Sequence, residues 1–434
     1  MPKRVLYLSY FYPPLGGPAV LRNLKTVKYL SRAGFEIDVI TVADLEYLYR
    51  DETLTSQQSE RRLFRTRSAD PMALLKKLRP ASSDEASRIY MNTPEKAKLM
   101  IRRLWPIDNK IGWLPFLLQT GRKALRENEY DLIYISLGPF SSGLGAYWLS
   151  KESGLPLVLD MRDYWTLLGD YELQGFGWQR RLSRHWEARL YRHASLIVTA
   201  TQGIGEDICE AFGAGLQSKC LTVYNGWDEE DFEGLDAIHP GQGFDLAYFG
   251  NIYARRSLGK FYAAVSSLRG EGILPTNTRI KLYGNFFRET VEEAQSSGVS
   301  DLVEFVPQLG HREAIRAMLS SHVLLLTLNS SGPRGTLSSK IFEYLRAGRP
   351  ILAMVPAHKE AASLLRDCGQ NYICAMESES SIRQALMRLI AEYEAEKRYP
   401  APPELERAAQ ISKLAAALES IKNKSSIQGR HSSK

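Results

Sequence analysis

The chain has 434 residues, of which 44% are hydrophobic and 24% are charged, and its formal net charge is +7. Its four cysteines lack the paired spacing of a zinc ribbon or a disulfide framework, and no apolar stretch approaches the roughly 20 residues that span a bilayer. The composition therefore predicts a globular protein of a reducing compartment, soluble or peripheral, with enough chain for two domains.

The first segment, MPKRVLYLSYFYPP, predicts a β-strand rather than a signal peptide, because aromatics and prolines interrupt its apolar run and no small-residue cleavage site follows. Beyond it, short apolar runs alternate with helical patterns. In the first half we expect a helix at 19–33 and strands at 5–9, 37–42, 132–136, 157–159 and 196–200. In the second half we expect strands at 245–250, 279–284, 303–306, 323–328 and 351–355. This alternation indicates two doubly wound α/β domains with parallel sheets.

The domain boundary is expected near 226–243, where Asn225-Gly226, an acidic run and a His-Pro-Gly stretch break the periodicity. The polar end of the chain is expected to be disordered. The predicted parts are a first domain at 1–230, a second domain at 240–400, a helix at 404–423 and a tail at 424–434.

Residues 44–125 are long for a connection inside such a domain, and we interpret them as an insertion that shapes the substrate side, with helices at 96–104 and 113–127. Between 75 and 125 the insertion concentrates cations and interleaves them with tryptophans. Such a segment either lies on an anionic membrane, faces a lipid-phosphate substrate, or is a solvated helical face. Nucleic acid is not expected, because no stacking platform or DNA-binding motif accompanies the charge.

A glycine turn, Pro13-Pro14-Leu15-Gly16-Gly17-Pro18, follows the first predicted strand, at the end where parallel sheets bind ligands. Gly16 and Gly17 would let the backbone approach a substrate phosphate, or they only make the turn. The turn lacks the G-x-G-x-x-G pattern, and no acidic residue follows the second strand as a clear ribose partner, which argues against NAD. Arg22, one turn into the helix, reaches the same cleft or solvent.

Charged residues follow the strand predicted at 157–159, in Asp160-Met-Arg162-Asp163-Tyr-Trp165, and the loop at 136–142 ends a neighbouring strand. Since this end of a parallel strand faces the ligand cleft, Asp163 is a candidate to accept a sugar hydroxyl or orient an acceptor. Arg162 is a candidate to hold a phosphate or carboxylate. The structural alternative is an ion pair between Asp160 and Arg162.

A second turn of this kind opens the second domain after Gly250. Asn251, Arg255 and Lys260 stand beside the start of a predicted helix. Cations at a helix N-terminus can neutralise a diphosphate leaving group in place of a metal ion. The alternative is a basic surface turn.

The stretch 332–356 combines a Gly/Pro/Ser loop, a short helix and a buried apolar strand. Ser338 and Ser339 are good N-cap residues, and Lys340 adds a cation in the first turn, which favours an anionic ligand such as phosphate. Glu343, in the second turn, is placed to chelate a ribose diol. Its alternative role is a solvated ion pair with Arg346.

No P-loop lysine motif, G-x-S-x-G elbow or H-E-x-x-H occurs. The segments above together resemble family 4 of the retaining glycosyltransferases, which have the GT-B fold. The similarity runs from the strand and glycine turn at 5–17 through Val223-Tyr-Asn-Gly-Trp-Asp228 to the Glu343 segment. It looks closest to bacterial members that build surface polysaccharides, which carry an element like Arg162-Asp163-Tyr-Trp165.

The resemblance implies that the first domain binds an acceptor, the second binds a nucleotide sugar across a cleft, and the last helix crosses back onto the first domain. It also implies a retaining reaction without metal or cofactor. The implied catalytic residues are Asp163, Arg162, Arg255 and Lys260. The implied donor-binding residues are Gly16, Gly17, Asn251, Ser338, Ser339, Lys340 and Glu343.

The chain departs from the family pattern at two positions. The family often has a second glutamate eight residues before the one matched by Glu343, and this chain has Gly335 there. Contacts to the donor sugar are then expected from elsewhere, such as the loop backbone at 334–338. A histidine common in the acceptor domain is also absent, with Arg162 at the most similar position.

We therefore expect an enzyme that transfers a hexosyl or N-acetylhexosaminyl group from a nucleotide-diphosphate sugar to a lipid-linked or polysaccharide acceptor. The resemblance implies surface polysaccharide biosynthesis, of lipopolysaccharide or exopolysaccharide, in the cytoplasm and peripherally at the inner face of the plasma membrane. Two alternatives stay open. One is an epimerase or hydrolase of the same fold, which would require a carboxylate or histidine pair in the cleft. The other is a non-catalytic nucleotide-sugar-binding partner of an assembly complex.

Overall fold

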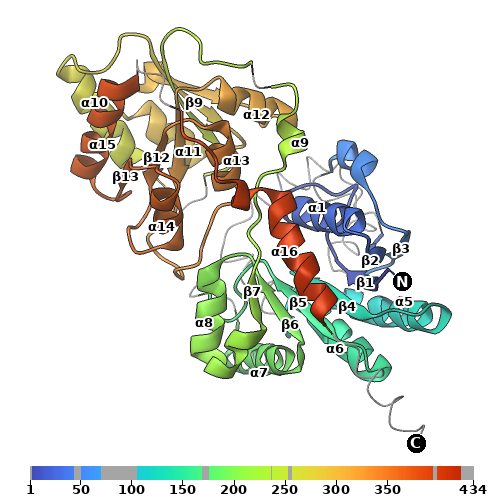
Figure 1. Cartoon of the computed structure of the whole chain (residues 1–434). Helices are drawn as coiled ribbons and strands as arrows, with labels where there is room; N and C mark the ends of the chain where they lie inside the picture. The colour runs from blue at the N-terminus through green and yellow to red at the C-terminus, as the bar shows by residue number, and fades with distance from the viewer. Residues whose placement is uncertain are drawn as a thin grey trace, which may run out of the picture. The chain divides into compact units, whose positions relative to one another are not determined.

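A computed structural model describes residues 2–43, 50–69, 105–168, 175–235, 237–252, 257–393 and 398–421. The chain forms two compact units (Figure 1). The N-unit contains Met1–Tyr224 and Gln410–Lys434, and the C-unit contains Asn225–Ala409. The helix expected at 96–104, the residue Arg255 and the tail at 424–434 lie outside the described residues.

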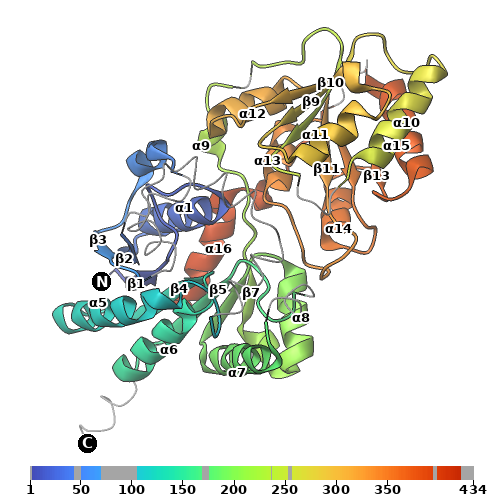
Figure 2. The same ribbon diagram turned by 180° about the vertical axis from the view of Figure 1, so that it is seen from behind.

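The N-unit is built on a seven-stranded parallel sheet of order β3-β2-β1-β4-β5-β6-β7. Its strands are β1 Arg4–Leu8, β2 Glu36–Val42, β3 Arg62–Thr66, β4 Leu132–Leu137, β5 Leu157–Met161, β6 Leu196–Thr199 and β7 Cys220–Thr222. Its helices are α1 Pro18–Arg32, α5 Leu114–Glu127, α6 Ser142–Ser153, α7 Gly177–His193 and α8 Gln202–Phe212. Figures 1 and 2 show α1 on one face of the sheet and α5, α6 and α7 on the other, which is why the inner strands are mostly apolar on both faces.

The C-unit has a six-stranded parallel sheet of order β10-β9-β8-β11-β12-β13. Its strands are β8 Phe244–Phe249, β9 Thr278–Tyr283, β10 Val303–Val306, β11 Val323–Thr327, β12 Ile351–Met354 and β13 Ile373–Cys374. Its helices are α9 Glu229–Phe232, α10 Gly259–Gly270, α11 Arg288–Gln295, α12 His311–Leu319, α13 Lys340–Ala347, α14 Glu360–Asp367 and α15 Glu379–Glu392. The prediction of two doubly wound α/β domains is thus confirmed.

Each predicted strand is present within about two residues of its expected bounds. The sequence did not indicate β3, β7 and β13, which are the outermost or last strands of their sheets. β3 and β7 are partly exposed and β13 has only two residues, so none has the long apolar run of an inner strand. Among the described residues, no helix is long and apolar enough to cross a membrane.

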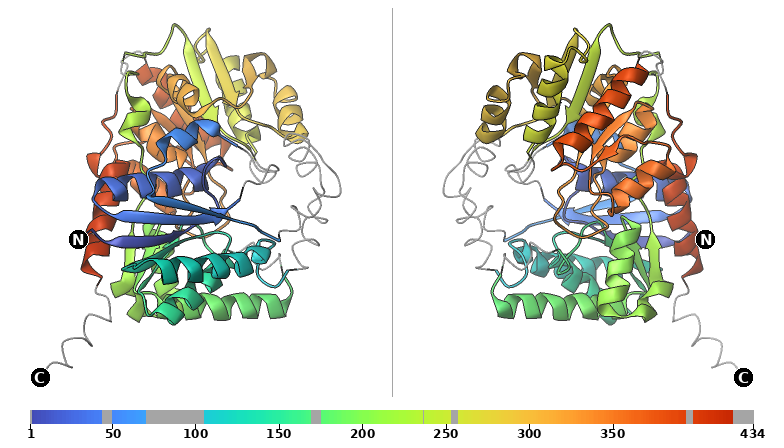
Figure 3. Two further views of the ribbon diagram at one scale, coloured as in Figure 1. Left: turned by 90° about the vertical axis from the view of Figure 1, so that its right-hand side faces the viewer. Right: turned by 90° about the vertical axis from the view of Figure 1, so that its left-hand side faces the viewer.

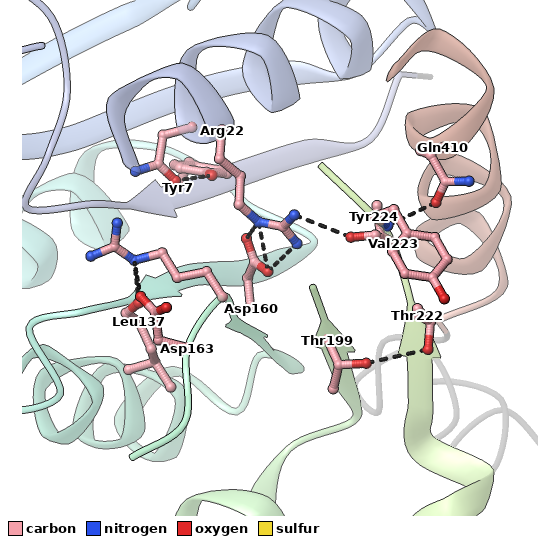
Figure 4. Close-up of polar contacts among 12 residues, drawn as sticks. Tyr7, Arg22, Leu137, Asp160, Asp163, Thr199, Thr222, Val223, Tyr224 and Gln410 are labelled. Carbon is pink, nitrogen blue, oxygen red and sulfur yellow. Dashed lines mark hydrogen bonds and ion pairs between the residues drawn. The ribbon is translucent and has the colours of Figure 1, made fainter. Parts of the chain in front are cut away.

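The last helix, α16 (Arg407–Ser420), belongs to the N-unit from Gln410 onward. The side chain of Gln410 accepts a hydrogen bond from the backbone N–H of Tyr224 at 2.8 Å (Figure 4). Lys413 donates to the carbonyl of Thr222, and Lys3 donates to the carbonyls of Leu418, Glu419 and Ile421 at the end of the helix. These contacts tie both ends of the N-unit's chain together.

A buried ion pair joins α1 to β5 in the centre of the N-unit (Figure 4). Nη2 of Arg22 lies 2.6 Å from Oδ1 of Asp160, and Nη1 donates to the carbonyl of Val223 at 3.1 Å. Arg22 is 4% exposed and Asp160 is fully buried. Burial is the largest single influence on the pKa of Arg22 and lowers it, but the charge and hydrogen bonds of Asp160, together with Tyr134 and Tyr7, raise the pKa overall. The expectations that Arg22 reaches a cleft or solvent, and that Asp160 pairs with Arg162, are therefore wrong.

Replacing Asp160 should show what this pair contributes. Asp160→Asn leaves the guanidinium buried without a counter-charge, so the free energy of unfolding should fall by about 3–5 kcal/mol in urea titrations. The double variant Arg22→Met with Asp160→Leu should be less destabilised than Asp160→Asn alone. The exposed pair of Arg269 and Asp301 is the control, and Asp301→Asn should leave the urea midpoint unchanged. Equal effects at both sites would contradict the assignment.

Candidate functional site

Both sheets place their first and fourth strands side by side, β1 beside β4 and β8 beside β11. At such a switch point the following loops diverge to opposite faces of the sheet, and ligands of open α/β sheets bind there, beyond the carboxyl ends of the strands. The loops that follow β1, β8 and β11 carry Gly16 and Gly17, Asn251, and Ser338 and Ser339. The topology therefore brings the predicted residues to the ligand-binding end of each unit.

The glycine turn after β1 leads into α1 through Gly17, which has a φ of +101°. This left-handed conformation favours glycine, and an added Cβ would find no atom within 4 Å. Backbone bonds hold the turn, since Leu15 N donates to Tyr12 O and Asp51 N donates to Pro14 O. Hydrogen bonds thus hold the turn, and the space beside the α-carbon of Gly17 is open to a ligand.

Arg162 lies at the end of β5 and is mostly buried. Its Nε and Nη2 donate to the carbonyls of Leu137 and Gly138, each at 2.9 Å, and its guanidinium lies 5.3 Å from the ring centre of Phe11. Burial lowers the pKa of Arg162. Its Nη1 has no hydrogen-bond partner in the described part of the chain, so one donor edge remains for a ligand. Asp163 is exposed, with a carboxylate oxygen 3.8 Å from Arg162 Nε.

A pocket of about 190 Å³ lies beside this segment in the N-unit. The rings of Phe140 and Trp165 stack in its wall at a centroid distance of 5.0 Å. The indole N–H groups of Trp105 and Trp165 are buried and have no hydrogen-bond partner among the described residues. The remaining lining residues are Ile107, Asp108, Asn109, Tyr164, Leu168, Gly175, Gln179 and Arg180. Aromatic faces with polar groups between them suit a sugar ring, whose faces are apolar and whose edge carries hydroxyls.

Asp108 holds one wall of this pocket. Its carboxylate accepts hydrogen bonds from the backbone N–H and hydroxyl of Ser141 at 2.8 and 2.7 Å, and from the N–H of Lys110 at 3.0 Å. Burial raises the pKa of Asp108 despite these bonds. The sequence pattern placed Trp105 in an insertion and the loop at 136–142 at a strand end, but it gave no sign that they meet.

In the C-unit, Glu343 projects from α13 with 24% of its side chain exposed. Its Oε1 lies 3.9 Å from Nε2 of His311, which lies 3.2 Å from Oδ2 of Asp231. Burial raises the pKa of Glu343, and Asp231 adds to the rise while His311 opposes it. The alternative pairing with Arg346 is not formed, because the guanidinium of Arg346 binds Glu229 instead.

His311 and Asp231 are site residues that the sequence did not indicate. They come from α12 and α9, while Glu343 comes from α13, and no short spacing connects the three. The only local signal was weak: His311 starts a helix that follows a strand end, as ligand residues of doubly wound domains often do.

Lys340 brings the start of α13 to the turn after β8. Its Nζ lies 4.8 Å from the ring centre of Tyr248, against the α-carbon of Gly250, where a side chain would overlap it. Ser339 is the N-cap residue but makes no capping bond, and neither its hydroxyl nor that of Ser338 has a partner in the described ranges. Hydroxyl and ammonium groups are both donors suited to phosphate oxygens, and these three residues are consecutive at the start of α13.

The other predicted residues of the C-unit are placed differently. Asn251 ties two loops together, since its side chain accepts from Asn285 N at 3.0 Å and its carbonyl accepts from the hydroxyl of Tyr248. Lys260 is exposed and lies 3.9 Å from Glu379. Asn251 therefore lies beside the Lys340 turn, whereas Lys260 has the surroundings of a basic surface residue.

Comparison with known proteins agrees with this architecture. A family model described as a glycosyl transferase 4-like domain matches residues 16–226. No curated protein matches the sequence. Among solved structures, sucrose-phosphate synthase from Thermosynechococcus elongatus superposes with a TM-score of 0.58 at 12% identity, covering 99% of this chain and 97% of its own.

Two further solved structures superpose on this chain with similar TM-scores. The lipopolysaccharide outer core galactosyltransferase WaaB gives a TM-score of 0.58 at 11% identity, with 96% of this chain and 99% of that one covered. UDP-GlcNAc 2-epimerase from Neisseria meningitidis, bound to UDP-GlcNAc, gives 0.54 at 12% identity, with 96% and 100% covered. At these identities the superpositions establish the fold. The chain therefore has the GT-B fold, and its residues 16–226 match a glycosyl transferase 4-like domain.

Proposed function

We propose that the protein is a retaining, metal-independent glycosyltransferase that uses a nucleotide-diphosphate sugar as donor. The observation that carries this proposal is the arrangement around α13. Glu343 presents a partly exposed carboxylate for the ribose hydroxyls, and Lys340, with Ser338 and Ser339 beside it, presents a cation and hydroxyls for the diphosphate. One helix thus offers the two kinds of group that a nucleoside diphosphate requires.

The reaction proposed exchanges one bond for another at the anomeric carbon. The bond from that carbon to the diphosphate oxygen breaks, and a bond to the acceptor hydroxyl forms on the same face of the sugar. The hydroxyl proton passes to the departing phosphate oxygen, so no side chain has to accept it. The leaving group carries the developing negative charge, and Lys340 stabilises it there. Gly335 cannot contact the sugar through a side chain, so backbone of the 334–338 loop would do so.

The N-unit pocket is proposed to receive a sugar of the acceptor. Trp105, Phe140 and Trp165 offer aromatic faces, and the two indole N–H groups without partners can donate to hydroxyl oxygens. Asp163 stands exposed at the adjacent strand end and would orient the attacking hydroxyl. A lipid-linked or polysaccharide acceptor in surface polysaccharide biosynthesis, at the inner face of the plasma membrane, fits this proposal. WaaG, another protein of similar structure, is a glycosyltransferase involved in lipopolysaccharide biosynthesis.

A second candidate is an epimerase or hydrolase of nucleotide sugars. One observation favours it: Asp231, His311 and Glu343 form the carboxylate and histidine cluster that such chemistry uses. We rank it second because Glu343 has the position that the family 4 resemblance assigns to ribose binding, and His311 then serves to orient it.

A donor screen separates these candidates. Radiolabelled nucleotide-diphosphate sugars incubated with the protein and a bacterial lipid extract should give label in the lipid fraction. Free or epimerised sugar released equally well without acceptor would favour the second candidate. Donor binding without any turnover would contradict both and indicate a non-catalytic binding partner.

Glu343 should control donor affinity in a pH-dependent way. The ionised carboxylate accepts the ribose hydroxyls, and burial raises the pKa of Glu343. Affinity for a nucleoside diphosphate should therefore fall as the pH drops through this raised pKa, at higher pH than an ordinary glutamate would cause. Glu343→Gln should weaken binding about 10- to 100-fold and abolish this pH dependence in calorimetric titrations. Glu304→Gln, at an exposed position of β10, should change neither property.

Lys340 and Lys260 provide a matched comparison for the leaving group. Lys340→Gln should lower kcat by about 100-fold, as removal of one preorganised charge donor does in other active sites. Lys260→Ala should have a smaller effect, because its ammonium is exposed and lies near Glu379. A larger loss of kcat for Lys260→Ala than for Lys340→Gln would locate the diphosphate at the start of α10, as the sequence pattern suggested.

A further inference from the structure

Three large hydrophobic side chains are strongly exposed in the described part of the chain, and all three belong to one region of the N-unit. They are Trp148 on α6 and Phe176 and Trp178 at the start of α7, with exposed fractions of 41%, 51% and 56%. The ring of Trp148 lies 6.4 Å from that of Trp186 on α7, so the aromatic side chains of the two helices are neighbours. Large exposed aromatic side chains on neighbouring helices are a feature of surfaces that contact another molecule.

The exposed face of α7 continues this region with a row of residues that includes three arginines. Trp178, Arg181, His185, Arg189 and Arg192 follow one another at spacings of three or four residues, which places them on one side of the helix. All five are exposed in the structure. The opposite side of α7 is buried through Ser183, Glu187 and Leu190.

The charge on this helix is almost wholly positive. α7 contains five arginines and one carboxylate, Glu187, which is buried; burial raises its pKa to about 7. Four of the arginines make no ion pair with a carboxylate in the described ranges, namely Arg181, Arg184, Arg189 and Arg192. Arg189 stacks on Tyr147 and Trp186, Arg184 stacks on Phe212, and Arg192 donates to the carbonyl of Ala188.

Helix α5, which carries part of the basic segment at 75–125, is different. Arg122 pairs with Glu152 at 2.6 Å, and Lys123 lies 3.8 Å from Glu127. The cations of α5 are thus largely compensated, while those of α7 are not. The rest of that basic segment lies outside the described residues.

We propose that Trp148, Phe176, Trp178, Arg181, His185, Arg189 and Arg192, here called the α6–α7 surface, dock the protein on an anionic lipid bilayer. Indole rings prefer the headgroup layer, and guanidinium groups bind lipid phosphates, so the combination fits a membrane surface. The 17 residues of α7 give a face about 25 Å long. Figure 3 shows α7 along the outer side of the N-unit, where such a face can lie parallel to a bilayer.

Sedimentation with vesicles tests this proposal without requiring turnover, so its outcome is independent of the proposed reaction. The protein should bind vesicles that contain phosphatidylglycerol, bind vesicles of pure phosphatidylcholine weakly, and dissociate at about 1 M salt, where the Debye length is ~3 Å. The variant Arg181→Gln with Arg192→Gln should bind about 25-fold more weakly, at about fivefold per cation. Trp178→Ser, added to this double variant, should weaken binding to the anionic vesicles still more.

The matched control removes the same charge from α5 through Lys123→Gln and Arg126→Gln. Vesicle binding of this control should stay close to that of the unchanged protein, and circular dichroism should show that all variants are folded. An equal loss in the α5 and α7 variants would overturn the proposal, since attraction would then be general rather than local. Binding to a single-stranded RNA oligonucleotide but not to vesicles would also overturn it.

Discussion

The buried ion pair between Arg22 and Asp160 is the constraint on which the ligand side of the N-unit depends. Arg22 lies in α1, whose start follows Gly17 directly. Asp160 lies in β5, two residues before Arg162. The same guanidinium binds the carbonyl of Val223, where the chain leaves β7. A buried ion pair is weak evidence for net stability, but its hydrogen bonds hold the groups that they join in one arrangement. Here it fixes the segments on either side of it, which carry the glycine turn and Arg162.

The same arrangement of a glycine beside a cationic side chain occurs at a strand end of both units. Gly138 follows β4 and Gly250 follows β8, and both have a φ of +107°. The guanidinium of Arg162 lies against Gly138 and the ammonium of Lys340 against Gly250, where a Cβ would overlap them. In each unit a glycine therefore makes space for a cation at the ligand-binding end of the sheet. The two cations then differ in role: Arg162 holds a loop through two carbonyls, whereas Lys340 rests on an aromatic ring.

The sequence was sufficient for the fold because inner parallel strands such as β4 and β11 are mostly apolar runs, with one serine or threonine each. It was insufficient for edge strands, since the RLFRT of β3 has no such run. Glu343 could be found because its helix carries local signals. Its neighbours His311 and Asp231 could not, because tertiary packing alone brings them together. For the same reason the sequence offers Arg162, two residues away, as an alternative partner of Asp160, and gives no sign of the observed partner Arg22, 138 residues away.

Helix α7 connects two features that were described separately. Gln179, near its start, lines the aromatic pocket and donates to the carbonyl of Trp105 at 2.6 Å. Glu187, further along, accepts from the backbone and hydroxyl of Thr166, the residue after Trp165. A protein held on lipid by the outer side of this helix would search for its acceptor by diffusion in two dimensions. Its rate would then follow the mole fraction of acceptor in the bilayer rather than the amount in the bulk volume.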